Sequence, residues 1–208
     1  MTAGQSATDL SAAVRAARGG NQEAFRVLYR EVQPGLLRYV RGLVGNNAQD
    51  AEDIASETWL QIARDIRSFR DEGAGFRGWA ARIARHRALD HVRRNQRRPA
   101  AVLPVEVLLD LPDPRDTATA AIDLAATNAT IALIATLPPD QAEAVLLRVV
   151  VGLDAKAAAH VMGKRAGAVR TAAWRGLRTL AGRLGKPTPP ADEAGVTDFV
   201  RSTPERSR

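Results

Sequence analysis

Cysteine is absent from these 208 residues, histidine occurs three times, and aromatic residues make up only 4%. Without cysteine the chain can form no disulfide scaffold and no thiolate zinc site, and it has no cysteine nucleophile. Its histidines, His86, His91 and His160, are too few for a histidine-rich metal centre. We therefore expect no metal site and no cofactor. With so few aromatic rings, the hydrophobic cores have to be built from Ala, Leu, Val and Ile, which suits small helical domains.

Long hydrophobic runs are absent as well. The longest apolar run covers residues 145–151, is interrupted by Arg148, and falls far below the roughly 20 residues that a membrane span requires. The N-terminal residues lack the basic start and hydrophobic stretch of a secretory signal. The sequence therefore predicts a soluble, cytoplasmic protein that does not insert into membranes, and the lack of cysteine fits a reducing compartment.

The charge balance is basic, with 30 Lys and Arg against 23 Asp and Glu and a formal net charge of +7. Lysine occurs only at positions 156, 164 and 186, so arginine carries nearly all of the positive charge. Arginine is the better residue for forked contacts to phosphates and guanine edges. A biased genome would produce the same preference, so the composition supports nucleic-acid binding only weakly and the placement of the charges has to decide.

Helical periodicity divides the chain into two parts and predicts an all-α fold. Apolar residues follow helical spacing over 21–44, as one helix or a pair broken at Pro34-Gly35, and again over 48–69 and 76–95. These segments predict an N-terminal helical bundle over 1–98. Residues 99–128 hold several Pro and Asp residues and predict a flexible acidic linker, although a helical pattern resumes at 119. We expect a helix-turn-helix domain over 129–184 and a disordered tail over 185–208.

The C-terminal part carries a basic helix-turn-helix pattern. The segment DAKAAAHVMGKRAGAVRTAAWRGLRTL contains a short helix, a glycine turn and a longer helix with a polar and basic outer face. Side chains of this kind reach grooves and phosphates of DNA, and here they are Lys164, Arg165, Thr171, Trp174, Arg175 and Arg178. An ordinary surface helix with solvated arginines is the alternative. For Trp174 we favour packing against the preceding helix over a DNA contact.

A second basic face is expected on the helix over 76–95. A turn of about 100° per residue places Trp79, Arg82, Arg85, His86 and Arg93 on one broad face. Arginines neutralise a nucleic-acid backbone while an aromatic ring can stack on an unpaired base, so this face suits single-stranded nucleic acid. Trp79 has an equally weighted alternative role as a core residue that packs with Ile83.

The helix over 48–69 carries an acidic stripe made of Asp50, Asp53, Glu57 and Gln61. DNA would be repelled by this stripe, so its natural complement is a basic protein surface, and a solvated helix face is the alternative. A metal site at this stripe is disfavoured because no histidine and no second acidic cluster lie nearby in the sequence.

Minimal catalytic motifs are missing. The sequence holds no GxxxxGK[ST], GxGxxG, GxSxG or HExxH, which disfavours phosphate-loop, dinucleotide, hydrolase and zinc-protease chemistry. His86, Asp90 and His91 lie close together in the sequence, but nothing suggests a nucleophile or an oxyanion site beside them. We expect a protein that is not an enzyme and has no catalytic residues.

The order of the segments over residues 10–184 resembles that of an extracytoplasmic-function sigma factor, a compact two-domain group of the bacterial sigma-seventy family. The resemblance rests on GNQEAFRVLYREVQPGLLRYVRGLVG, DAEDIASETWLQIAR, FRGWAARIARHRALDHVRRNQRR and the helix-turn-helix block. Two separate motif blocks in the right order are far more specific than either block alone. The resemblance implies a sigma factor that directs core RNA polymerase to specific promoters and initiates DNA melting.

The resemblance also implies a role for each surface. Asp50, Asp53, Glu57 and Gln61 would grip the clamp helices of the largest polymerase subunit, and the second domain would meet the flap of the second-largest subunit. The minus-ten promoter element would be opened and a flipped base captured by Phe76, Arg77, Trp79, Arg82, Arg85, His86 and Arg93, aided by the loop over 70–75. The minus-thirty-five element would be read by Lys164, Arg165, Arg170, Thr171, Trp174, Arg175 and Arg178. An anti-sigma factor is a further partner that many relatives have and that no residue here demonstrates.

Three departures from the family pattern bear on specificity. His86 stands where relatives usually carry Asn, Ala157 replaces a larger aliphatic residue, and Ala172-Ala173 replaces Arg-Leu. The promoter sequence therefore does not carry over from relatives. Two other readings stay open at this point. One is a stand-alone helix-turn-helix regulator that binds DNA without polymerase, and the other is a helical enzyme or adaptor centred on the acidic helix.

Overall fold

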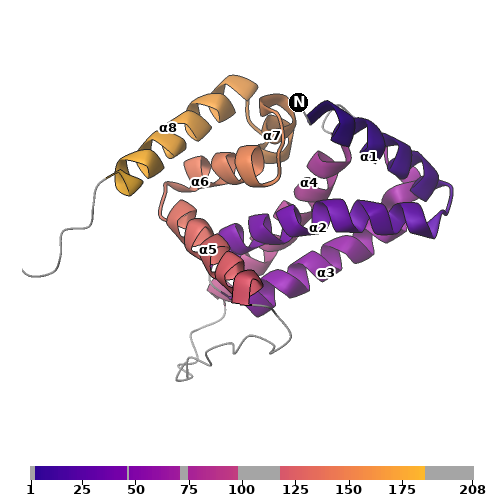
Figure 1. Ribbon diagram of the computed structural model, residues 1–208, viewed down its shortest axis with the longest axis horizontal. Helices are drawn as coiled ribbons and strands as arrows, with labels where there is room; N and C mark the ends of the chain where they lie inside the picture. The colour runs from indigo at the N-terminus through magenta and orange to yellow at the C-terminus, as the bar shows by residue number, and fades with distance from the viewer. Residues whose placement is uncertain (1–2, 46, 71–74, 98–117, 186–208) are drawn as a thin grey trace, which may run out of the picture.

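The computed structural model describes residues 3–45, 47–70, 75–97 and 118–185, with side chains in α1 from Leu10 and in α5 from residue 126. Over these residues the chain is helical and contains no strand, which confirms the all-α fold class (Figure 1). The elements are α1 (Ala3–Arg18), α2 (Gln22–Val44), α3 (Ala48–Asp65), the 3₁₀ turn η1 (Ile66–Ser68), α4 (Gly75–Arg97), α5 (Ala118–Ala135), α6 (Pro139–Val145), the π-helical turn η2 (Leu146–Val150), α7 (Ala155–Met162) and α8 (Ala166–Leu184).

Helices α1–α4 form a first unit around a well-buried core. Leu28, Val32 and Leu36 of α2 are almost fully buried and meet Ile62 of α3 in that core. Most of the scarce aromatic rings gather beside them, because Trp59 contacts Phe25, Tyr29 and Phe76, and Phe76 in turn contacts Phe69 and Trp79. The expectation of a purely aliphatic core therefore does not hold for this unit.

Helix α1 was not expected from the sequence. Leu10, Val14 and Ala17 are spaced four and three residues apart, and all three are buried in the core of the first unit. This spacing is the ordinary signature of one apolar helix face. Most other residues of this segment are small or polar, so its apolar face is weak in the sequence.

Helix α2 runs unbroken through Pro34, so the alternative of a broken pair at Pro34-Gly35 is wrong. Proline removes one backbone donor from a helix interior. The carbonyl oxygen of Pro34 accepts a hydrogen bond from Arg38 Nε at 3.0 Å. At Gly35 a Cβ atom would come within 3.2 Å of the carbonyl oxygen of Val150, so the glycine allows a close approach of η2.

Helices α5–α8 form a second unit with an aliphatic core. Leu146 and Leu147 are fully buried there, together with Val169 of α8. A break at Leu137-Pro138-Pro139 separates α5 from α6. Asp154 caps α7 by accepting from the Ala157 amide at 2.7 Å, and Gly163 ends the helix in the left-handed conformation. The result is the expected helix-turn-helix formed by α7 and α8.

Three of the sequence expectations fall wholly or partly outside the described residues. These are the loop over 70–75, of which 71–74 are not described, the linker over 99–128, and the tail over 185–208. The last part of the expected linker, from Ala118 onward, is helical and belongs to α5. No helix within the described ranges is long and apolar enough to cross a membrane.

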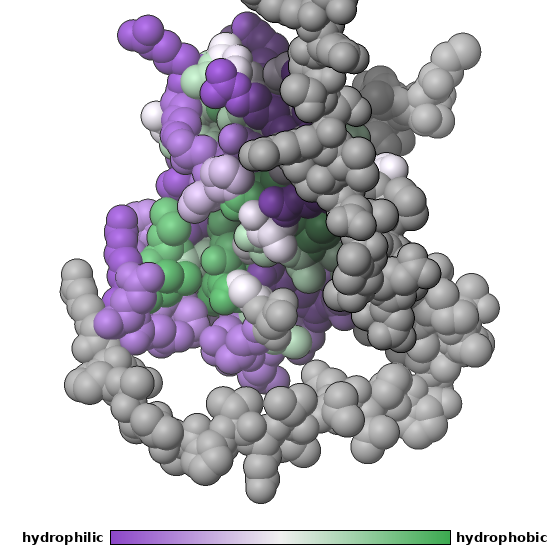
Figure 2. Space-filling model, turned by 90° about the vertical axis from the view of Figure 1, so that its left-hand side faces the viewer, coloured by the Kyte–Doolittle hydropathy of each residue, from purple (hydrophilic) through white to green (hydrophobic). Residues whose placement is uncertain are grey.

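The two units pack directly on each other. Helix α4 contacts α7, and α2 contacts both α5 and η2. Tyr39 of α2 and Ala81 of α4 are fully buried in the same cluster as the core of the second unit. A few large apolar side chains of the second unit remain exposed, including Val149, Leu177 and Leu184. Figure 2 shows apolar side chains gathered in the middle of one face, bordered by hydrophilic ones.

Candidate nucleic-acid interface

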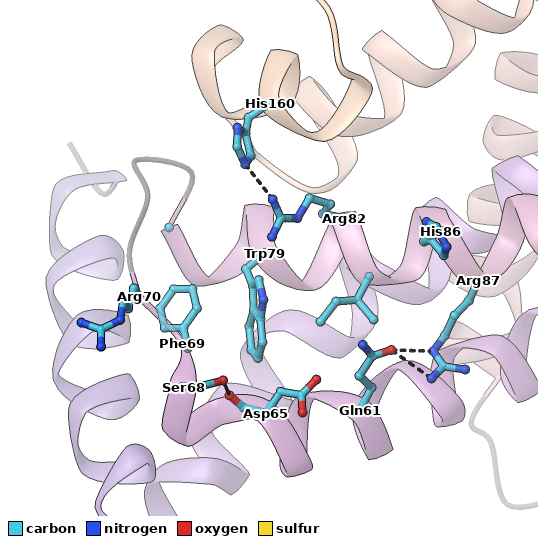
Figure 3. A pocket seen from close by; sticks show the side chains of 12 residues that line it. Gln61, Asp65, Ser68, Phe69, Arg70, Trp79, Arg82, His86, Arg87 and His160 are labelled. Carbon is cyan, nitrogen blue, oxygen red and sulfur yellow. Dashed lines mark hydrogen bonds between the residues drawn. The ribbon is translucent and has the colours of Figure 1, made fainter.

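A cavity of about 490 Å³ lies between α3, η1, α4 and α7 (Figure 3). It has an aromatic wall and a basic rim, which is the combination that unpaired bases and their phosphates favour. Its lining side chains come mainly from the first unit, with His160 as the contribution of the second. The lining includes Gln61, Asp65, Ser68, Phe69, Arg70, Trp79, Arg82, Ile83, His86, Arg87 and His160.

The aromatic wall is Trp79, supported by two phenylalanines. Its ring centroid lies 4.8 Å from that of Phe69 and 5.8 Å from that of Phe76. Trp79 is half-buried and packs on the core while it also borders the cavity, and its expected contact with an unpaired base stays a prediction. Phe76 is only 4% exposed. A ring buried to this extent supports the wall from within, and the expected contact of Phe76 with DNA stays a prediction.

The basic side chains expected to share one face are divided by the structure. Arg82 and His86 border the cavity, with Arg82 Nη1 3.0 Å from His160 Nε2 and His86 80% exposed. Arg85 turns instead toward the second unit and pairs with Glu143. Arg77 lies 3.8 Å from the carboxylate of Glu31, and Arg93 lies 3.5 Å from that of Asp90. The last three arginines do not line the cavity.

The acidic stripe lies on α3, whose N-terminus is capped by Asn47 through the amide of Asp50 at 3.2 Å. Asp53 is exposed and accepts a hydrogen bond from Gln49 at 3.1 Å. Asp50 lies 3.0 Å from His91 Nε2. Leu60, 63% exposed and one helical turn beyond Glu57, was not expected to take part.

Arg87 of α4 is a second residue that sequence reasoning missed. Its Nη1 lies 2.6 Å from Glu57 Oε2, and its Nε and Nη2 lie 3.2 and 2.9 Å from Gln61 Oε1. Since Gln61 and Arg87 both line the cavity, one guanidinium joins the acidic stripe to the cavity (Figure 3). Periodicity along a single helix could not have found it, because the contact depends on how α3 and α4 are packed.

The outer face of α8 is basic and open. Arg170, Thr171 and Arg175 are exposed, and the guanidinium of Arg178 lies 5.3 Å from the ring centroid of Trp174. Trp174 is 58% exposed, so the expectation that it packs against the preceding helix is wrong. The buried side of α8 is made by Val169, Ala173, Gly176 and Leu180, which leaves no place for the indole there. Arg165 is exposed before the helix, and Lys164 pairs with Asp140.

Glu143 of α6 is a buried carboxylate that sequence reasoning did not single out. It accepts hydrogen bonds from Tyr39 Oη at 2.9 Å and from Arg85 Nε at 2.6 Å. Burial raises the pKa of Tyr39 well above its ordinary value, and the neighbouring carboxylate raises it further. The hydrogen bond to Glu143 likewise raises the pKa of Arg85. Both groups therefore stay protonated at neutral pH, and the charge on Glu143 is balanced by one guanidinium.

Metal binding receives no support from the described ranges, in which no three His, Asp or Glu side chains gather to hold an ion. The acidic residues of α3 point along a surface, and two of them are already paired with Arg87 and His91.

Comparisons with known proteins match both parts of the chain. The family model of Sigma-70 region 2 matches residues 28–98, and that of Sigma-70, region 4, matches residues 127–180. The ECF RNA polymerase sigma factor BldN of Streptomyces coelicolor is 34% identical over 168 residues, which cover 81% of this chain and 63% of BldN. The ECF RNA polymerase sigma factor SigD of Mycobacterium tuberculosis is 34% identical over 177 residues, which cover 82% of each chain.

Solved structures show the same fold. CnrH in complex with the cytosolic domain of CnrY has a TM-score of 0.58 and 22% identity, and the match covers 83% of this chain and 94% of CnrH. The sigma factor RpoE from Bartonella quintana, in complex with the anti-sigma factor NepR, has a TM-score of 0.56 and 22% identity, with 77% and 96% covered.

One helical unit carries a helix-turn-helix, and the other carries an acidic stripe beside a basic aromatic cavity. The two family matches, in this order along the chain, make the class specific. The chain belongs to the sigma-70 family, within its ECF group of RNA polymerase sigma factors.

Proposed function

We propose that this chain binds core RNA polymerase, directs it to specific promoters and starts the opening of the DNA strands. The observation that carries the proposal is the pairing of a region 2 match with a region 4 match, each lying over one of the charged surfaces described above. A stand-alone regulator would use α7 and α8 but would leave the acidic stripe of α3 without a role. We propose further that the chain has no catalytic activity of its own and that RNA synthesis belongs to the polymerase.

In this proposal the cavity beside Trp79 holds a base flipped out of the minus-ten element. Unstacking a base costs a few kcal/mol, and stacking on an aromatic side chain returns about 1–3 kcal/mol per base. Trp79 supplies the ring, while Arg82 and the exposed His86 are placed to meet a phosphate or a base edge. The hydrogen-bonding groups of histidine differ from those of asparagine, so the preferred base follows from His86 in this chain.

The acidic stripe of α3 would bind the clamp helices of the largest polymerase subunit. Asp53 is the most available carboxylate, and the exposed Leu60 adds apolar area next to it. Electrostatic complementarity of this kind increases the rate of association and fixes the orientation of the partners. The second unit would contact the flap of the second-largest subunit while α8 lies in the major groove of the DNA.

Helix α8 would read the minus-thirty-five element in the major groove. Arg170, Arg175 and Arg178 lie on its open face, with Thr171 and Trp174 between them. Arginine forms bidentate contacts to guanine, and the neighbouring arginines neutralise phosphates. The residues that position the protein and those that specify sequence can be separated by mutation, because loss of a phosphate contact weakens binding to all sequences alike.

An inhibitory partner is part of the proposal as well. The solved structure of RpoE from Bartonella quintana contains an anti-sigma factor. We propose that this chain is also the target of an anti-sigma factor, and affinity capture from the source bacterium under non-inducing conditions tests this point. Recovery of core polymerase alone, under all growth conditions, would contradict it.

Run-off transcription tests the main proposal. Purified core RNA polymerase is incubated with sheared genomic DNA from the source bacterium, with and without this protein. We expect new discrete start sites that share upstream elements, and co-purification of the protein with core polymerase. Absence of both results would reject the proposal, and specific DNA binding without polymerase would favour a stand-alone regulator.

A further inference from the structure

His160 of α7 has no part in the proposed capture of a base, although it lines the cavity beside Trp79. Its Nε2 lies 3.0 Å from Arg82 Nη1, and the two side chains border the cavity on the side of α7 (Figure 3). Within the described part of the chain, neither of them is paired with a carboxylate. Two basic groups that meet at a cavity without an acidic partner would attract an anion there.

The cavity has the size and the lining of a small-molecule site. Its volume is about 490 Å³, and it lies where the two helical units meet. Ligand pockets typically have volumes of roughly 300–1,000 Å³, and they occur preferentially at such interfaces. An aromatic wall is combined here with a few convergent polar groups, which fix the orientation of a ligand. These features together fit a molecule with one flat ring and one anionic group.

Trp79 provides the surface for the flat ring. It is half-buried, and its ring centroid lies 4.8 Å from that of Phe69, which holds it in place. Arg82 follows three residues later on α4, and residues at this spacing are neighbours on the surface of a helix. One ligand can therefore stack on the indole and reach the guanidinium. A nucleobase joined to a phosphate through its sugar has this form.

Asp65 of α3 indicates which base fits. It is exposed, and it is the one acidic side chain among the described residues that line the cavity. Figure 3 shows it with Gln61 on the side of α3, across from Arg82 and His160. A carboxylate accepts hydrogen bonds through both oxygens and donates none. Guanine has adjacent donors, N1–H and N2–H, on its pairing edge, whereas adenine has an acceptor at N1, so the carboxylate favours guanine.

We propose that the cavity between α3, α4 and α7 binds a free guanine nucleotide. The base stacks on Trp79 with its donors toward Asp65, and the 5′-phosphates lie at Arg82 and His160. Arginine suits this position because its guanidinium forms forked hydrogen bonds to phosphate. The binding site itself does not depend on the proposed function. One consequence does, because the nucleotide would occupy the place of the flipped base and compete with a single DNA strand.

Calorimetric titration of the full chain with GDP tests the site without polymerase or DNA. We expect one site per chain. Guanosine lacks the phosphates and pyrophosphate lacks the base, so each should bind more weakly than GDP. ADP should bind at least about tenfold more weakly, because its base would leave the carboxylate without donors.

Three substitutions test the roles of the lining side chains. Arg82→Gln is expected to weaken GDP binding by about tenfold or more, because it removes a charge-assisted hydrogen bond. His160→Gln should also weaken GDP binding, by a smaller factor. Asp65→Asn should reduce the preference for GDP over ADP, since an amide offers one donor and one acceptor in place of two acceptors.

Matched controls separate loss of the site from loss of the fold. Arg26 pairs with Glu23 on α2, His91 pairs with Asp50 on α3, and neither Arg26 nor His91 lines the cavity. Arg26→Gln and His91→Gln should therefore bind GDP as the unchanged chain does. Circular dichroism should show the same helix content in every variant.

The indole signals of the three tryptophans locate the bound base. Trp59 is 6% exposed in the core, and Trp174 lies on the outer face of α8. In nuclear magnetic resonance spectra, GDP should shift the Nε1–H signal of Trp79 most. Trp79→Phe assigns that signal by its disappearance. A largest shift at Trp174 would place the ligand on α8 and overturn the proposal.

Each outcome decides the proposal. No binding of GDP, or equal binding by the unchanged chain and by both Arg82→Gln and His160→Gln, overturns the site. Equal affinity for pyrophosphate or for ADP overturns the assignment of a guanine nucleotide. If GDP binds but fails to displace a single strand carrying the minus-ten element, the nucleotide site stands and the proposed place of the flipped base is rejected. A failure of run-off transcription leaves the nucleotide site untouched, so the two failures are distinguishable.

Discussion

The two units use arginine in different ways. In the first unit, several arginines of α2 and α4 pair with carboxylates of the same unit, as in Arg41 with Glu52 and Arg87 with Glu57. On α8, within the part of the chain whose side chains are described, neither Arg170 nor Arg175 pairs with a carboxylate. A cation without a local partner is free to release its counterions to a phosphate. In the first unit, the number of arginines is therefore a poor guide to the size of the proposed DNA-binding surface, because several of them are paired with carboxylates. On α8 it is a better guide.

The hydrophobic cores of the two units also differ in composition. Every ring-to-ring contact among the described residues lies in the first unit, where Trp59 joins α2 to α3 and α4. The second unit is held by aliphatic side chains and alanines, and its single tryptophan is exposed. Large rings packed edge to face fix their neighbours in place. The unit that carries the cavity is thus the one with the more rigidly specified core.

Reversal of the acidic stripe should have the largest effect on function. We expect Asp53→Lys with Glu57→Lys to abolish binding to core polymerase, because the stripe would then repel a basic clamp. The fold should remain, since exposed ion pairs contribute little to stability. A pull-down with core enzyme measures the effect, and Glu23→Lys on α2 serves as the control. Unchanged holoenzyme assembly would show that the stripe does not take part in the interface with core polymerase.

Loss of the central ring should have the largest effect on stability. Trp59 is 6% exposed, contacts three other rings and donates from Nε1 to Gln33 Oε1 at 2.5 Å. We expect Trp59→Ala to lower the free energy of unfolding by about 3–5 kcal/mol, as measured by urea denaturation. Leu147→Ala in the second unit should cost about 2–5 kcal/mol. An equal loss in the free energy of unfolding in both variants would show that the two cores do not differ.

Removal of two arginines from the open face of α8 should weaken DNA recognition. Arg175→Ala and Arg178→Ala are each expected to cost about 1–3 kcal/mol in duplex binding if they contact bases. The assay is binding of the holoenzyme to a promoter found by run-off transcription. Arg183→Ala is the control, because Arg183 bonds Thr136 and lies beyond the open face. Transcription at the wild-type level in both variants would reject the recognition-helix assignment.

The helix caps should have the smallest effect, and a similar one in both units. Asp154 Oδ1 accepts from the Ala157 amide at 2.7 Å, and Asn47 Oδ1 accepts from the Asp50 amide at 3.2 Å. We expect Asp154→Ala and Asn47→Ala each to lower the free energy of unfolding by about 1 kcal/mol. Thermal unfolding followed by circular dichroism measures this. A much larger loss for Asp154→Ala would mean that the turn before α7 also holds the units together.

Periodicity predicted most of the helices and the helix-turn-helix, because each of these depends on residues close together in the chain. It also placed the stripe of α3 on one face, which the structure retains. What it could not provide was the packing between elements. Glu143 looks like a surface residue of a short helix until α2 and α4 are placed against it. Trp174 was placed on the outer face but was expected to pack against the preceding helix, whereas its side chain is 58% exposed.

Arg87 connects two binding surfaces through a single charge. It is bonded to Glu57 on the acidic stripe and to Gln61 at the cavity. A ligand that draws Glu57 away from Arg87 leaves a less neutralised guanidinium beside the cavity, where a phosphate would be attracted. Coupling free energies are reciprocal, so the factor by which polymerase then raises the affinity for DNA equals the factor by which DNA raises the affinity for polymerase. If the stripe meets polymerase and the cavity holds DNA as proposed, this one side chain would couple the two binding events through thermodynamic linkage.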